Sequence, residues 1–210
     1  MLSSKGFDLW ADGYDKSVNL SEESNEYPFA GYRDVLAFIY QQVRAKNNAN
    51  VLDIGFGTGV LTAKLYDDGY NIVGIDFSNK MLDIARQKMP QARLIQWDFS
   101  KGLPDEVKKE QFDFIISTYA IHHLTETEKV EFIHLLSQKL TETGMILLGD
   151  VSFRTRTELE VCKESYSQYW DDEEIYFVAD EIIEALAGKY LCEYTKLSHC
   201  AGVLRIKSKE

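Results

Sequence analysis

The chain has 210 residues and a formal net charge of −11, with 45% hydrophobic and 27% charged residues. This length suits one domain with its own core, and the ordinary composition excludes a low-complexity or disordered chain. The negative charge opposes binding to nucleic acid, which is itself a polyanion, so we expect no nucleic-acid partner and favour small molecules.

The cysteines and the chain start narrow the class of protein further. Cys162, Cys192 and Cys200 are odd in number and lack CxxC spacing, which argues against a disulfide framework or a zinc site. The four histidines lack the carboxylate spacing of a metal site, so we expect no metal. The first ten residues have no apolar signal region, and no stretch reaches the roughly 18 apolar residues of a membrane span. We therefore expect a cytoplasmic protein that does not enter a membrane.

The first half of the chain alternates helical and strand patterns. Apolar residues recur at helical spacing in 29–44, and short apolar runs next to turn residues indicate strands. Ser78 has the position of a helix N-cap, and Pro90 marks where that helix ends. The predicted elements are a helix at 29–44, a strand at 50–54, a helix at 60–66, a strand at 71–75, a helix from 78 to near 90, and a strand at 93–97.

The second half of the chain continues the alternation of helices and strands, but it ends with two strands that have no helix between them. Thr125 and Glu128 have the spacing of a capping box, which predicts a helix running through Leu140 and stopped by Gly144. The other elements predicted here are a strand at 112–116, a strand at 145–148, a polar helix at 155–170, a helix at 179–187, and strands at 191–197 and 202–207.

Alternating strands and helices predict an α/β fold with a parallel sheet covered on both faces. The link between the last two strands is too short for a crossover helix, so these strands must form an antiparallel hairpin. We expect a doubly wound, Rossmann-like, seven-stranded and mostly parallel sheet with an antiparallel C-terminal strand. A ligand should bind at the carboxyl ends of the first strands, where the strand order reverses.

A glycine loop joins the first strand to the next helix, in the segment 51–59 with the sequence VLDIGFGTG. Gly55, Gly57 and Gly59 would let the backbone bend tightly and approach a ligand closely. Nicotinamide and flavin proteins use a G-x-G-x-x-G loop for the same purpose. Here the pattern is G-x-G-x-G, and Val60 stands where the third small residue belongs.

An acidic residue stands at or near the end of each of the first three predicted strands. Asp53 precedes the loop; it would repel a pyrophosphate, but it would attract the ammonium of an amino-acid ligand or orient the loop amides. Asp76, followed by Phe77, ends the second strand, where a carboxylate can accept hydrogen bonds from both ribose hydroxyls. Asp98 ends the third strand and could accept from an adenine amino group, with Phe99 covering the ring.

These motifs resemble those of a known family. The segment 53–59, Asp76 and the pair 98–99 look like the cofactor motifs of the class I S-adenosylmethionine (SAM)-dependent methyltransferases, and the resemblance covers nearly the whole chain. The segments 10–15 (WADGYD) and 117–124 (STYAIHHL) are similar to the YrrT-like methyltransferases, which are small stand-alone bacterial enzymes. The resemblance implies SAM as cofactor, S-adenosylhomocysteine (SAH) as product, and cofactor contacts from Asp53, Gly55, Gly57, Gly59, Asp76, Phe77, Asp98, Phe99, Thr118, Tyr14 and Tyr32.

The resemblance also implies a division of the single domain. Residues 1–48 would form an N-terminal helical lid, 49–150 the SAM-binding core, and 151–210 the substrate-cover helices and the C-terminal hairpin. Tyrosines of the lid, Tyr14, Tyr27 and Tyr32, could contact the sulfonium by cation–π interaction or could only pack with each other. The aromatic and acidic segment 166–177 would cover the acceptor pocket.

His122 and His123 are the candidate catalytic residues. They follow the fourth strand, and a neutral imidazole there could take a proton from an oxygen or nitrogen acceptor. Neighbouring residues on a helix point about 100° apart, so we expect at most one of the two to face the site. The alternative is that both only cap or pack the next helix. Methyl transfer needs mainly alignment in a dry site, so a base is not essential.

The resulting hypothesis is a SAM-dependent methyltransferase, a monomer or homodimer, that acts on an oxygen, nitrogen or sulfur nucleophile of a small molecule. The alternatives are a SAM-binding sensor or scaffold without catalysis and a nicotinamide-dependent oxidoreductase. The sequence does not specify the methyl acceptor.

Overall fold

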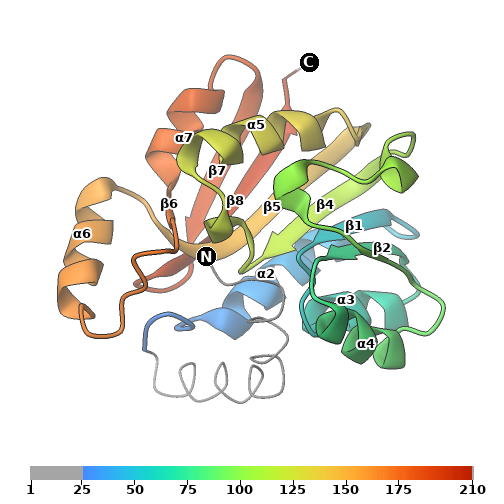
Figure 1. The fold of residues 1–210 in the computed structure, drawn as a ribbon. Coiled ribbons are helices and arrows are strands. Elements are labelled where there is room, and N and C mark those ends of the chain that lie inside the picture. Colours follow the sequence, from blue (N-terminus) through green and yellow to red (C-terminus); the bar gives the residue numbers. More distant parts are fainter. Residues whose placement is uncertain (1–25, 210) are drawn as a thin grey trace.

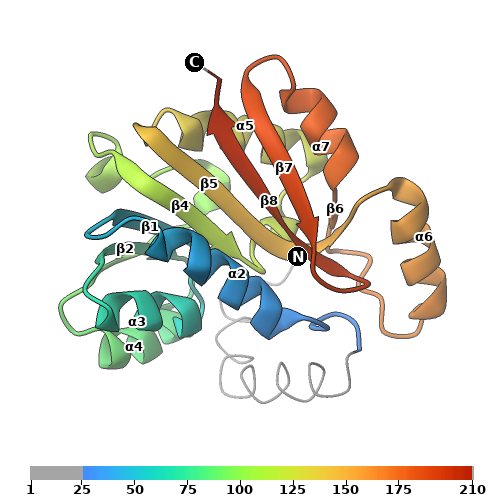
Figure 2. The same cartoon turned by 180° about the vertical axis from the view of Figure 1, so that it is seen from behind.

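The computed structural model describes residues 26–209, which are built around a twisted mixed sheet (Figures 1 and 2). In this part of the chain, seven strands lie in the order β3-β2-β1-β4-β5-β8-β7, and β6 pairs with the end of β5. The strands are β1 (Asn50–Ile54), β2 (Asn71–Asp76), β3 (Arg93–Gln96), β4 (Phe112–Thr118), β5 (Leu140–Phe153), β6 (Phe177–Val178), β7 (Tyr190–Lys196) and β8 (Ala201–Ser208).

The central strands β3, β2, β1, β4 and β5 are parallel, whereas β8 is antiparallel to both β5 and β7. The predicted doubly wound fold and the C-terminal hairpin are therefore confirmed. The order reverses at β1, since the chain proceeds to β2 and β3 on one side and to β4 on the other. The carboxyl ends of β1, β2 and β4 consequently open at one edge of the sheet.

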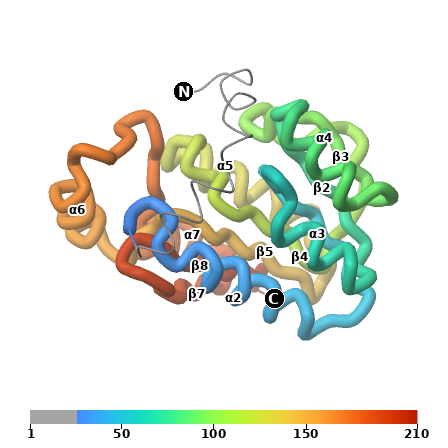
Figure 3. Tube along the Cα trace, turned by 90° about the horizontal axis from the view of Figure 1, so that it is seen from below, coloured from blue at the N-terminus to red at the C-terminus, as the bar shows by residue number. Residues whose placement is uncertain are grey.

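Helices cover both faces of the sheet (Figures 1 and 3). They are α2 (Tyr32–Arg44), α3 (Val60–Asp67), α4 (Asn79–Lys88), α5 (Glu126–Ser137), α6 (Arg156–Ser165) and α7 (Ala179–Leu186). Successive strand residues point to opposite faces, so Val51 packs in the core under α2 and α3, while Leu52 and Ile54 pack in the core under α5 and α7. Within residues 26–209, no helix is long and apolar enough to cross a membrane.

Two predicted helix starts are confirmed by their caps. The Ser78 hydroxyl accepts a hydrogen bond from the Met81 amide at 3.2 Å, and α4 begins at Asn79. At α5, the Thr125 hydroxyl and the Glu128 side chain form the reciprocal bonds of a capping box. Both caps satisfy backbone amides that the first helical turn leaves without partners.

The predicted continuation of α5 through Leu140, with Gly144 as its stop, is wrong. The helix ends at Ser137, and Leu140 already belongs to β5. The register between β4 and β5 shifts at this point, because Phe112 pairs with Leu140 but Phe114 pairs with Met145. A Cβ on Gly144 would lie 2.9 Å from the Phe112 carbonyl oxygen, so the glycine permits the bulge rather than ending a helix.

Other element ends also differ from prediction. The first helix begins at Tyr32 rather than at 29, after Gly31 in a left-handed conformation with φ 77°. The polar helix ends at Ser165 rather than at 170, because the following aromatic residues pack onto Tyr27. The third strand ends at Gln96, and the short strand β6 was not predicted.

Candidate cofactor and acceptor site

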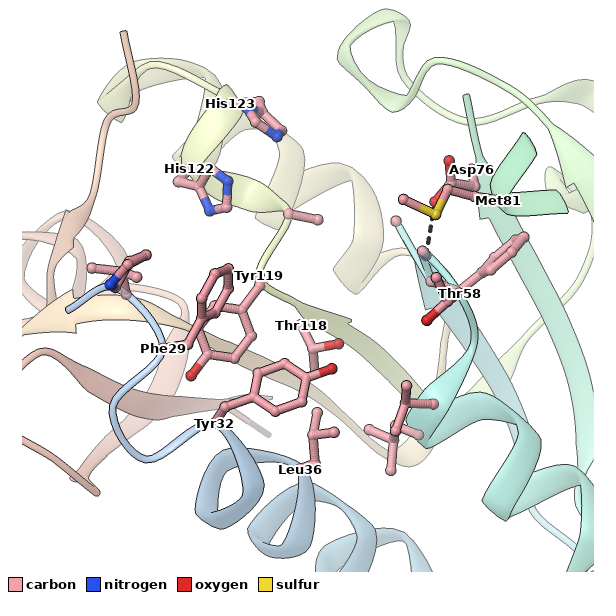
Figure 4. A pocket seen from close by; sticks show the side chains of 18 of the residues that line it. Phe29, Tyr32, Leu36, Thr58, Asp76, Met81, Thr118, Tyr119, His122 and His123 are labelled. Atoms are coloured by element: carbon pink, nitrogen blue, oxygen red, sulfur yellow. Dashed lines mark hydrogen bonds between the residues drawn. The ribbon is translucent and has the colours of Figure 1, made fainter. Parts of the chain in front are cut away.

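A cavity of about 490 Å³ lies at the carboxyl ends of β1, β2 and β4 (Figure 4). This volume falls in the range of cofactor and small-molecule sites. The sheet edge, the start of α2 and the segment 171–176 contribute to its walls. Nine of the predicted site residues line the cavity: Tyr32, Gly55, Gly57, Asp76, Phe77, Phe99, Thr118, His122 and His123.

Three predicted cofactor residues do not line the cavity, and Tyr14 lies outside the described residues. Asp53 is buried behind the loop, and Gly59 is the N-cap of α3 with φ 73°. Asp98 accepts hydrogen bonds from the amide and hydroxyl of Ser100 and pairs with Lys101 at 3.1 Å. Its cofactor contact stays a prediction.

The glycines of the loop have different local roles. Gly55 has φ 69°, and a Cβ there would lie 2.4 Å from the Ala120 Cβ, so its lack of a side chain lets the loop pack against the segment after β4. Gly57 has φ 57°, yet among residues 26–209, apart from its chain neighbours, no atom lies within 4 Å of its Cβ position. Since Gly57 lines the cavity, the space that its missing side chain leaves is open to a ligand.

Asp76 connects the loop to the end of β2. Its carboxylate accepts hydrogen bonds from the amide of Gly57 at 2.8 Å and from the amide of Ser78 at 2.9 Å. Figure 4 shows the Asp76 side chain next to the loop, with a dashed line marking the hydrogen bond between them. A carboxylate offers about four acceptor positions, so one carboxylate can serve ligand hydroxyls as well as backbone amides.

Asp53 is an acid in an unfavourable environment. It is 1% exposed; one carboxylate oxygen accepts a 2.5 Å bond from the Thr62 hydroxyl, and Oδ1 has no hydrogen-bond partner among the described residues. Burial, together with the nearby charge of Asp76, raises the pKa of Asp53 to about 7. A positive ligand group near the loop would lower the electrostatic cost of ionising it.

We expect Asp53→Asn to stabilise the ligand-free protein near pH 8 and to change its stability much less near pH 4. The pKa of Asp53 is higher in the folded protein than its ordinary 3.8, so the free energy of unfolding falls as pH rises between these values and stays low above about 7. An amide does not ionise and avoids this loss. The rise in the pKa of Asp53 corresponds to an expected gain near pH 8 of up to about 4 kcal/mol, or roughly 8–16 °C in melting temperature.

Thermal unfolding at the two pH values tests this expectation. Asp83→Asn is the matched control, because Asp83 is exposed and pairs with Arg86 on α4. If Asp53→Asn changed the melting temperature by the same amount at both pH values, this result would contradict the role of Asp53 ionisation.

Both predicted histidines line the other part of the cavity, from the short turn η3 (Ile121–His123) after β4. The expectation that at most one faces the site is therefore wrong: the segment is one turn of 3-10 helix rather than an α-helix, and both side chains line the cavity (Figure 4). The two rings lie 4.3 Å apart, centre to centre. Burial and the neighbouring His122 lower the pKa of His123 to about 3, so His123 is neutral near pH 7.

His122 is held by an acid that the sequence did not reveal. Its Nδ1 lies 2.7 Å from Oδ1 of Asp150, which is fully buried on β5 and also accepts the Val151 amide at 2.8 Å. Burial by itself would lower the pKa of His122, but the charges of Asp150 and Glu174 outweigh it and raise the pKa. The available signal for Asp150 was an acid within an otherwise apolar strand.

The segment 166–178 and residues near Tyr27 cover this end of the cavity. The Tyr176 hydroxyl donates to Glu174 at 2.5 Å and contacts the Tyr27 hydroxyl at 2.5 Å. The Tyr27 ring stacks on Trp170, with the ring centres 5.1 Å apart. Tyr27, Glu174 and Tyr176 all line the cavity. Glu174 was not singled out from the sequence, although it lies in the predicted cover segment.

The doubly wound sheet, the glycine loop after β1 and the acid at the end of β2 define a Rossmann-like α/β protein that binds its ligand at the strand ends. A protein family described as a methyltransferase domain matches residues 51–144. An uncharacterized methyltransferase of Geobacillus sp. (strain WCH70) is 39% identical over 151 residues, which cover 71% of this chain and 68% of the relative. Another, from Bacillus cytotoxicus, is 33% identical over 208 residues, which cover 94% of each chain.

Solved structures share the fold at low sequence identity. Magnesium protoporphyrin IX methyltransferase (ChlM) from Synechocystis PCC 6803, with bound SAH, superposes with a TM-score of 0.68 at 19% identity, covering 86% of this chain and 85% of that one. With the relatives above, the chain belongs to the class I SAM-dependent methyltransferases. Family membership excludes the nicotinamide-dependent alternative.

The cavity fits this cofactor. Three acids line it, Asp76, Asp171 and Glu174, and no lysine or arginine does so among residues 26–209. Such a lining suits a positively charged ligand without phosphate groups, which describes SAM. The open space at Gly57 allows the loop backbone to lie close to that ligand.

We expect Gly57→Ala to weaken SAM binding at least about tenfold, because the new methyl group would occupy space that the ligand needs. The left-handed φ should also cost about 1 kcal/mol in unfolding free energy. Gly69→Ala is the matched control, since Gly69 has φ 88°, open space around its Cβ position and no place in the cavity lining.

Calorimetric titration with SAM and thermal unfolding of both variants measure the two effects separately. Similar losses of stability with a loss of affinity only in Gly57→Ala are the expected outcome. Unchanged SAM affinity in Gly57→Ala would mean that the ligand does not approach this part of the loop.

Proposed function

We propose that the protein transfers a methyl group from SAM to a nucleophilic oxygen, nitrogen or sulfur atom of a small molecule. The observation that carries the proposal is the single continuous cavity described above. It joins the glycine loop and Asp76, which suit a nucleoside, to His122, Glu174 and Tyr176, which suit a polar acceptor. Its bounded volume and its acidic lining favour a small acceptor over nucleic acid.

We propose that residues at three strand ends bind the cofactor. Asp76 would bind the ribose hydroxyls, Phe77 and Phe99 would contact the base, and the Gly55–Gly57 backbone would lie along the amino-acid part. Asp53 and Gly59 would shape the loop from behind, whereas Thr118 and Tyr32 would border the ligand from β4 and α2. Asp98 would reach the adenine amino group only if its side chain leaves Ser100 and Lys101.

His122 is the proposed base. SAM supplies, when bound, a methyl group on a positively charged sulfur, so the protein must mainly align the acceptor and take up its proton. Asp150 holds Nδ1 of His122, which leaves Nε2 on the side of Glu174 and the cavity. His123, with a pKa of about 3, is a weak base and would instead shape the pocket.

The proposal extends to the organisation of the chain. Residues 1–48 would act as a lid, 49–150 as the cofactor core and 151–210 as the acceptor cover; Tyr27 and Tyr176, which meet over the cavity, support this division. The chain would belong to the YrrT-like subgroup, as the similarity of the segments 10–15 and 117–124 implies. We propose a cytoplasmic monomer or homodimer.

Calorimetry with SAM and SAH, followed by measurement of SAH release over a panel of amines, alcohols, thiols and carboxylates, tests the proposal. Binding of both cofactor forms and turnover of at least one acceptor are expected. Binding without turnover of any acceptor would favour a sensor or scaffold, and failure to bind either form would refute the proposed function. Titration with NADH serves as the negative control.

A further inference from the structure

Two hydrogen-bond acceptors face each other at the acceptor end of the cavity. Asp150 accepts from both the Val151 amide and the His122 ring, so in the neutral ring Nδ1 of His122 carries the proton and Nε2 is an acceptor. Nε2 lies 3.6 Å from Oε1 of Glu174, which is longer than a hydrogen bond. His122 is 7% exposed, so little water reaches Nε2, whereas the Glu174 side chain is partly exposed. A ligand that donates to both atoms would satisfy them.

Glu174 is held in this orientation by its neighbours. Its other oxygen, Oε2, accepts from the Tyr176 hydroxyl, which also contacts the Tyr27 hydroxyl. Tyr27 in turn stacks on Trp170, and the Trp170 and Tyr176 rings meet edge to face at 5.1 Å. These contacts fix Oε2 to the segment 166–178 and to Tyr27. Oε1 is left directed toward His122.

The charges around the acceptor end of the cavity favour a positively charged ligand. Asp171 lines the cavity beside Glu174, and no described lysine or arginine does. The nearby Lys129 is buried, and its ammonium donates to the carbonyl oxygens of Leu124 and Ile175. Even with a charged Lys129 and a protonated His122, the three carboxylates Asp150, Asp171 and Glu174 leave a net negative charge here. A carboxylate or phosphate ligand would be repelled, whereas a cation is attracted and can also contact the tyrosine rings.

We propose that the methyl acceptor is a primary or secondary amine that enters as its ammonium ion. One N–H donates to Oε1 of Glu174 and another to Nε2 of His122. An alcohol or a thiol has only one such hydrogen and no positive charge, so it would leave one acceptor unsatisfied. The inference rests on the proposed methyl transfer and specifies its substrate class.

Atoms and charges balance in the proposed methyl transfer. The ammonium gives one proton to Nε2 of His122 and becomes a neutral amine with a lone pair. That lone pair forms the N–C bond to the methyl group while the C–S bond breaks and its electrons remain on sulfur. The products are an N-methylammonium ion and SAH, and His122 afterwards releases its proton to solvent. Glu174 holds the nitrogen in place throughout.

Binding of four matched probes to the SAH-saturated protein tests the inference: benzylamine, benzyl alcohol, benzoate and benzyltrimethylammonium. They share a ring and differ in charge and in the number of N–H or O–H donors. We expect benzylamine to bind roughly tenfold or more tightly than the other three, because only it offers both charge and two donors. Glu174→Gln should weaken benzylamine binding roughly tenfold without changing SAH affinity. Glu164→Gln, an exposed change on α6, is the control and should change neither affinity.

Each outcome of these titrations either supports or overturns the assignment of an amine as the methyl acceptor. Benzyl alcohol or benzoate binding as tightly as benzylamine, no detectable benzylamine binding, or unchanged binding by Glu174→Gln would each overturn the amine assignment. Equal binding of benzylamine and benzyltrimethylammonium would overturn the two-donor geometry. Because SAH affinity is measured in the same titrations, failure to bind SAH would refute the methyltransferase function itself, whereas SAH binding without amine preference refutes only this inference.

Discussion

Asp76→Ala is expected to lower the affinity for SAM and SAH roughly 100-fold or more. The change removes the carboxylate that would accept two ribose hydroxyls, and hydrogen bonds to a charged group contribute about 1.5–3 kcal/mol each. It also removes the anchor that binds the Gly57 amide and thereby positions the loop. Isothermal titration calorimetry with each cofactor form measures the loss.

The controls separate ligand contact from folding. Asp83→Ala, on the exposed side of α4, should bind SAM as the wild type does. Asp98→Ala should have a smaller effect than Asp76→Ala, because Ser100 and Lys101 already engage the Asp98 carboxylate. Thermal unfolding verifies that each variant is folded. Wild-type affinity in a folded Asp76→Ala variant would place the ribose elsewhere.

Asp150→Asn is expected to lower kcat roughly 100-fold or more while leaving SAM affinity unchanged. The amide can donate to Nδ1 of His122, which would move the ring proton to Nε2 and prevent this atom from acting as a base. Asp150 does not line the cavity, so direct ligand contacts are retained. Initial rates with the best acceptor of the panel, together with SAM titration, measure both quantities.

The pH profile supplies a second readout for the same pair. His122 must be neutral to accept a proton, and its pKa lies above the ordinary 6.5, so wild-type activity should rise with pH along a limb centred above that value. Loss of the Asp150 charge lowers the pKa of His122 and should shift the limb of the residual activity to lower pH.

Two further variants test whether Asp150 acts through His122. His122→Gln should be as impaired as Asp150→Asn, and the double variant no worse than either, since the two residues act as a unit. His123→Gln should lower kcat less than about tenfold. A loss of SAM affinity in Asp150→Asn without any loss of kcat would contradict the positioning role.

The cofactor end of the site could be predicted because its signals are local. Gly55 and Gly57 belong to one short loop, and Asp76 ends a recognisable strand, so parallel pairing of β1 and β2 brings them to the same cavity. The acceptor end could not be predicted in the same way. His122 and Asp150 are 28 residues apart and meet only because β4 and β5 are neighbours in the sheet. Glu174 reaches His122 only because the cover segment returns over the strand ends.

The alternation of helices and strands, the caps at Ser78 and Thr125, and the glycine loop were determined by the sequence itself, because each depends on residues a few positions apart. Contacts between distant segments decided the rest. Gly144 permits a bulge because the Phe112 carbonyl lies against it, and the proposed acceptor end of the cavity forms where Tyr27 meets Tyr176, 149 residues away. Such contacts depend on how the packed layers meet, which no local pattern specifies.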